Sequence, residues 1–135
     1  MQPEALAEGR AWFQKASADL RCADIDLAAS PPLIEDALFH CQQAAEKSMK
    51  GFLSAHDRPF QKTHDLDELG RACELLDPSL KPLLLPARDL TVFAWQYRYP
   101  GATDVPSLVE TRNALATACS VYETLLSRLP DSAHP

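Results

Sequence analysis

Residues 40–66 read HCQQAAEKSMKGFLSAHDRPFQKTHDL, and this stretch decides the fold of the chain. Its first part has apolar residues at helical spacing on two adjacent seams, which predicts a central helix over residues 33–55. A short basic loop from Asp57 to His64 follows. Asp65, with Glu68 three residues later, fits the cap of a further short helix, and Thr63 is an alternative cap.

The flanking segments are also helical. Residues 3–28 and 104–129 each carry a strict heptad of inward positions, which keeps one seam facing a partner helix in a left-handed bundle. Three prolines between residues 78 and 86 break the segment before residue 100, whose straight part is expected to begin near Pro86 and end at Tyr99. We therefore expect one all-α domain over 1–135: an up-and-down four-helix bundle with left-handed twist plus one short extra helix, with a frayed tail at 130–135.

Composition excludes several classes of protein. The net charge of −6 argues against a general nucleic-acid binder, so no DNA partner is expected. No apolar run approaches the roughly 20 residues of a membrane span, and no signal peptide is visible, so a cytoplasmic location is predicted. The four cysteines are scattered and match no zinc spacing, which predicts small buried apolar groups. Neither a metal site nor a cofactor is predicted.

Two groups of side chains are candidates for binding. His40, Gln43, Lys47 and Lys50 are spaced three and four residues apart, so they form one stripe on the central helix. The stripe could line a phosphate groove. It could equally be a solvated face on which Glu46 and Lys50 form an i,i+4 pair.

The second group lies near the ends of two helices. Lys62 and His64 precede a helix N-terminus, where an anion is favoured, although His64 could simply cap that helix. Further along, Arg98 could bind phosphate while Tyr97 and Tyr99 stack on a base. Alternatively, Arg98 pairs with an acid on another helix and both tyrosines pack.

Three strings carry a family resemblance: HCQQAAEKSMKGFLSAH, THDLDEL and QYRYPG. Together with Trp12 and Asp19-Leu20 in the first helix, they resemble the HEPN family of small bacterial and archaeal helical proteins. The resemblance implies a fold like the substrate-binding domain of kanamycin-type nucleotidyltransferases. It also implies a homodimer, a nucleotide or RNA ligand, and a minimal nucleotidyltransferase as partner, in some cases as a toxin–antitoxin pair.

Catalytic members of the wider family are RNases with an Arg, a polar residue and a following His. The match in this chain is Arg58 to His64, with Pro59 at the polar position, in the loop after the second long helix. Three functions therefore stay open: a non-catalytic nucleotide-binding or nucleotidyltransferase-partner module, a metal-independent RNase, and a purely structural interaction bundle. In the RNase, Arg58 would stabilise the phosphorane charge and His64 would move the proton of the 2'-hydroxyl.

Overall fold

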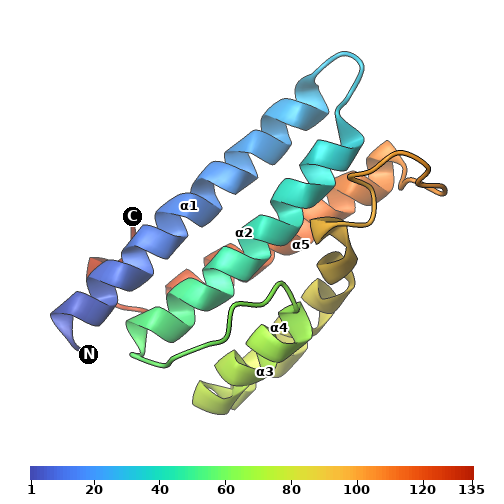
Figure 1. Cartoon of the computed structure of the whole chain (residues 1–135). Coiled ribbons are helices and arrows are strands. Elements are labelled where there is room, and N and C mark those ends of the chain that lie inside the picture. Colours follow the sequence, from blue (N-terminus) through green and yellow to red (C-terminus); the bar gives the residue numbers. More distant parts are fainter.

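In the computed structural model, which describes residues 1–135, the chain is helical and contains no strand (Figure 1). The three long helices are α1 (Pro3–Ala28), α2 (Ile34–Ala55) and α5 (Leu108–Ser127). Two shorter helices, α3 (Leu66–Leu76) and α4 (Lys81–Leu84), lie between α2 and α5. The all-α prediction is confirmed, while the left-handed twist of a four-helix bundle stays a prediction.

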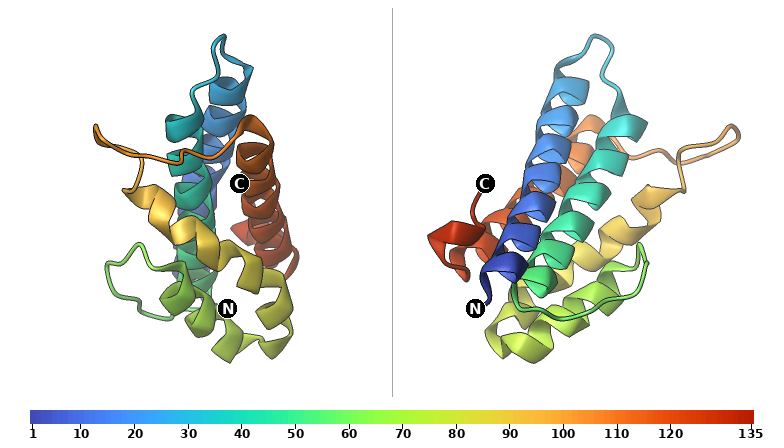
Figure 2. Two further views of the ribbon diagram at one scale, coloured as in Figure 1. Left: turned by 90° about the vertical axis from the view of Figure 1, so that its right-hand side faces the viewer. Right: turned by 60° about the vertical axis from the view of Figure 1, so that its left-hand side comes forward.

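α2 lies at the centre of the molecule. It packs along α1 and also contacts α5, α3 and the 3-10 segment that precedes α5 (Figures 1 and 2). Most of its residues are buried, as the two adjacent apolar seams predicted. The bulkiest fully buried side chains of the core include Phe13, Leu38, Met49, Phe52, Leu53 and Leu125.

Two glycines bring α1 and α2 close together. A Cβ added to Gly9 would lie 2.9 Å from the Gly51 carbonyl oxygen and 2.9 Å from the Ala55 Cβ. A Cβ on Gly51 would lie 2.9 Å from ring atoms of Phe13. This close helix contact explains a glycine at position 51, where a helix interior favours alanine.

The segment after α3 differs from the expected straight helix. It consists of η1 (Pro78–Leu80), α4 and η2 (Leu85–Ala94), of which η1 and η2 are 3-10 helices. Prolines at the first or second position of each piece remove backbone donors, so one continuous α-helix cannot form. The helical path ends at Ala94 rather than Tyr99, and a long connection over residues 95–107 follows, part of which projects beyond the helices (Figure 2).

Side-chain caps are present at the starts of α3 and α5. The Asp65 side chain accepts a hydrogen bond from the Asp67 backbone N–H at the start of α3. Ser107 and Glu110 form a reciprocal capping box at the start of α5. These bonds satisfy backbone donors that have no partner inside the helix, which fixes where each helix begins.

The C-terminal segment is ordered against the bundle, contrary to the expected frayed tail. Residues Asp131–Ala133 form η3, and Ala133 is fully buried. Arg10 Nη1 donates to the Ser132 carbonyl oxygen at 2.8 Å, and the His134 ring lies 2.8 Å from the Leu126 carbonyl oxygen. Burial and hydrogen bonding of this backbone explain the order.

Two further findings concern membrane-spanning segments and the cysteines. None of the helices has the length and apolarity that crossing a membrane requires. All four cysteines are free, and Cys41 and Cys73 are buried among apolar neighbours. Burial raises the pKa of the Cys41 thiol to about 12, which makes it a poor nucleophile.

Candidate functional site

The polar face of α2 carries the stripe that the sequence singled out, and its side chains are held by two acids. Asp19 of α1 lies 2.8 Å from the His40 Nδ1 and 2.7 Å from the Lys47 Nζ. Glu46 of α2 pairs with Lys50 at 3.0 Å, as the i,i+4 spacing predicted. The basic stripe is therefore neutralised within the chain and is not an open cationic groove.

Several side chains of this face contact Glu46. Its carboxylate is almost fully buried and also accepts hydrogen bonds from Gln42 at 3.1 Å and from His64 at 2.6 Å. Burial alone would raise the pKa of Glu46, but the hydrogen bonds from His64, Lys50 and Gln42 outweigh it and hold the pKa below its ordinary value of 4.5. A buried carboxylate with this many donors stays ionised and fixes the groups around it.

Gln43 and Lys50 complete the face. Gln43 donates to the Gln42 side-chain oxygen at 2.7 Å and so extends the network toward the surface. The Lys50 ammonium lies 5.5 Å from the Trp12 ring centroid and 5.7 Å from that of Phe60, which places it within cation–π range of both. Lys50 is 8% exposed, so it is a structural cation and has little surface to offer a ligand.

One ring nitrogen of His64 is bonded to the protein, and most of its side chain is exposed. Its Nδ1 is bonded to Glu46 and its backbone oxygen accepts from Gln42, yet the side chain is 67% exposed. With Nδ1 donating to the carboxylate, Nε2 of the neutral ring is an acceptor that faces solvent. At the start of α3 the Asp65 carboxylate caps the helix end and Asp67 and Glu68 follow it, and the anion site expected there stays a prediction.

The structure does not bring Arg58 and His64 together. Neither a hydrogen bond nor an ion pair joins them; Arg58 instead lines a surface pocket with Glu8, Ser54 and Phe60. Lys62 is exposed and forms no ion pair. Arg58, Lys62 and His64 share a loop, and their grouping into one site stays a prediction.

The aromatic-Arg string is split. Tyr97 is buried and its ring centroid lies 5.9 Å from that of Phe93, so it belongs to the core and cannot stack on a base. Tyr99 is 73% exposed. Arg98 lies over the Phe39 ring, 3.9 Å from its centroid, and 4.0 Å from an oxygen of Asp36. The alternative in which Arg98 reaches an acid on another helix matches this geometry.

Three residues of α1 that the site prediction left out face the α2 stripe: Trp12, Asp19 and Asp26, here called the α1 line. They are seven residues apart, and they contact Lys50, the His40–Lys47 pair and the Asp36–His40 turn in that order. The seven-residue spacing of one aromatic and two acids beside an apolar heptad was the available signal.

The comparison with family models shows the class of this helical domain, a nucleotide-related or RNase-type helical module. The HEPN domain family model matches residues 10–129, which is most of the chain, and the chain belongs to the HEPN family. The family resemblance seen in the three sequence strings is confirmed. Comparison with curated proteins and comparison with solved structures both find no match.

Proposed function

We propose that this HEPN chain binds the phosphate groups of a nucleotide on the polar face of α2 and acts beside a nucleotidyltransferase partner. The observation that carries the proposal is the way Asp19 and Glu46 hold basic side chains in place. Lys47 and His64 have one acidic contact each inside the protein and an exposed remainder. Side chains fixed in this way lose little further conformational entropy when a ligand binds.

Arg98 and Tyr99, at one end of the face, offer further contacts. Arg98 is 41% exposed on its side chain and is stacked on Phe39, so its remaining N–H donors are available to an anion. Tyr99, next to it, presents an exposed ring on which a base can stack. Because the face is close to neutral overall, we expect binding to fall only weakly with salt.

Calorimetric titration with ATP, GTP and a short RNA tests the ligand. We expect binding of at least one, weakened about tenfold in Arg98→Ala by loss of one charge-assisted contact worth about 1.4 kcal/mol. Lys81→Ala is the matched control, because Lys81 is exposed on α4 and forms no ion pair. Absence of binding to all three ligands, or equal loss in both variants, would refute the proposal.

The partner is tested separately. Affinity purification from the native cell followed by mass spectrometry is expected to recover a nucleotidyltransferase, and light scattering of the purified chain is expected to show a homodimer. A toxin–antitoxin role requires further that expression of one gene without the other arrests growth. Recovery of no nucleotidyltransferase would remove this half of the proposal.

The Glu46–His64 contact favours a second candidate, a metal-independent RNase. A buried carboxylate that fixes the tautomer of an exposed imidazole is the arrangement of a general base. Arg58 is not in contact with His64, so a cation from a second subunit would have to stabilise the phosphorane charge. RNA cleavage in EDTA by wild type and His64→Ala decides the matter, and equal rates would exclude His64 as the base.

A further inference from the structure

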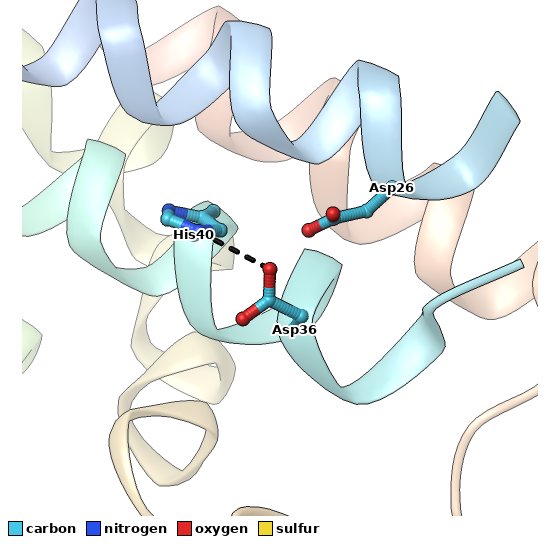
Figure 3. Close-up of side chains that lie close together, drawn as sticks. All are labelled: Asp26, Asp36 and His40. Atoms are coloured by element: carbon cyan, nitrogen blue, oxygen red, sulfur yellow. Dashed lines mark ion pairs between the residues drawn. The ribbon is translucent and has the colours of Figure 1, made fainter. Parts of the chain in front are cut away.

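A cluster of three side chains lies near the turn that joins α1 and α2, beside the Arg98 that the proposed function uses. Asp26 lies in the last turns of α1, and Asp36 and His40 lie one turn apart on α2 (Figure 3). One potential ligand atom from each residue lies within 4.8 Å of the other two. Figure 3 shows the Asp26 carboxyl directed from α1 toward the other two side chains.

Asp26 is the least satisfied member. The residue is 7% exposed, and its buried Oδ2 has no hydrogen-bond partner. A buried carboxylate oxygen without a donor is costly, so this position requires a proton or a cation.

His40 is oriented for the same purpose. Its Nδ1 lies 2.8 Å from Asp19 Oδ1, which makes Nδ1 the protonated nitrogen of the neutral ring. Nε2 lies 3.4 Å from Asp36 Oδ2; a protonated ring would pair with that carboxylate, and a neutral ring would share a cation with it. A carboxylate behind the far nitrogen of a histidine is the usual second-shell partner of a metal-bound imidazole.

We propose that Asp26, Asp36 and His40 bind a divalent first-row transition cation, Zn²⁺ or Mn²⁺. The 3.4 Å spacing of Nε2 and Oδ2 equals the separation of two ligands on a tetrahedral ion with bonds of about 2.1 Å. Imidazole nitrogen with two carboxylates suits such ions, and the two negative charges match the ion's charge. The half-exposed Asp36 side chain can turn to close the remaining distance.

The surroundings are compatible with an ion. Lys47 is engaged by Asp19, and the Arg98 guanidinium is 4.0 Å from the Asp36 oxygen, too far for a direct hydrogen bond. Asp36 also lines a surface pocket with Leu33 and Val105, which gives solvent access. Three protein ligands leave at least one position open to water or to an oxygen of a ligand. The sequence-based expectation of no metal overlooked this site because Asp26 comes from a different helix.

The test is equilibrium binding of Mn²⁺ and of Zn²⁺ to the full chain after chelation, with no nucleotide present. We expect one ion per chain. Asp26→Asn and His40→Gln should each weaken binding by more than the roughly 10–100-fold that loss of an outer-shell partner causes, and Asp19→Asn should fall within that range. Asp24→Asn, which removes an exposed acid two residues from Asp26, is the matched control and should bind as wild type.

Two outcomes would overturn the proposal: no stoichiometric ion at millimolar concentration, or an ion retained by both Asp26→Asn and His40→Gln. Mn²⁺ guards against binding by thiols such as Cys41, because it prefers oxygen and nitrogen ligands. Circular dichroism of each variant without metal shows whether it is folded. The result is independent of the nucleotide titration, so failure of one proposal leaves the other standing.

Discussion

Replacing Gly9 by alanine is expected to destabilise the protein, whereas the same change at Gly70 is expected to stabilise it. Alanine gains about 1 kcal/mol over glycine in a helix interior. At Gly70 the new Cβ would have the Met49 Cε as nearest atom at 3.9 Å, an ordinary contact, so the gain is kept. At Gly9 it would lie 2.9 Å from the backbone oxygen of Gly51, which cannot rotate away.

Overpacking of this kind costs about 1–3 kcal/mol, so Gly9→Ala should lose up to about 2 kcal/mol net. The two variants should therefore differ by about 1–3 kcal/mol in opposite directions. Urea denaturation followed by circular dichroism measures the difference, with equal slopes showing that the unfolded states are comparable. If both variants gain the same stability, α1 and α2 do not approach as closely as the glycine contact requires.

Three further predictions concern charges and caps. Burial and then the adjacent Asp36 carboxyl raise the pKa of Asp26 from 3.8 to about 6. The stability that the protonated Asp26 supplies is therefore full below pH 3.8 and is lost as the pH rises through about 6, up to about 3 kcal/mol by pH 7. Asp26→Asn should flatten this loss in urea melts at several pH values. Asp19→Asn should cost about 2 kcal/mol by the same assay at neutral pH, because a charged hydrogen bond to Lys47 is lost. Ser107→Ala should cost about 1 kcal/mol in thermal unfolding, since it removes half of the capping box with Glu110; no change would show that the cap contributes nothing.

Local signals explain why much of the fold could be predicted. The bounds of α1, the central place of α2 and the caps at Asp65 and Ser107 follow from periodicity and from side chains that act within a few residues. The prolines predicted a break before residue 100. They did not predict 3-10 geometry, because that depends on how η2 packs against α2 and α3, where Thr91 accepts a hydrogen bond from the Leu66 backbone.

The site was harder to predict because its charges are balanced over long sequence separations. The stripe on the central helix suggested a phosphate groove, yet Lys47 is neutralised by Asp19, which lies 28 residues earlier. In the same way, the spacing of Tyr97 and Tyr99 around Arg98 suggested a stacking site. In the connection after η2, however, the Tyr97 ring is buried and the Tyr99 ring is exposed. Only the helix arrangement decides which acid or which core a side chain meets.

α2 provides both the centre of the core and the buried side chains of the polar face. Its buried members include Gln42, Glu46 and Lys50, so a substitution that alters ligand chemistry there also removes packing or leaves a buried charge unpaired. Relatives that acquire a new specificity should therefore vary on the elements facing α2. Trp95 and Tyr99, which are exposed in the connection between η2 and α5, can change without threatening folding. In evolutionary terms the proposed recognition surface has two parts: side chains of α2 that the fold holds fixed, and exposed side chains such as Trp95 and Tyr99 that are free to diversify.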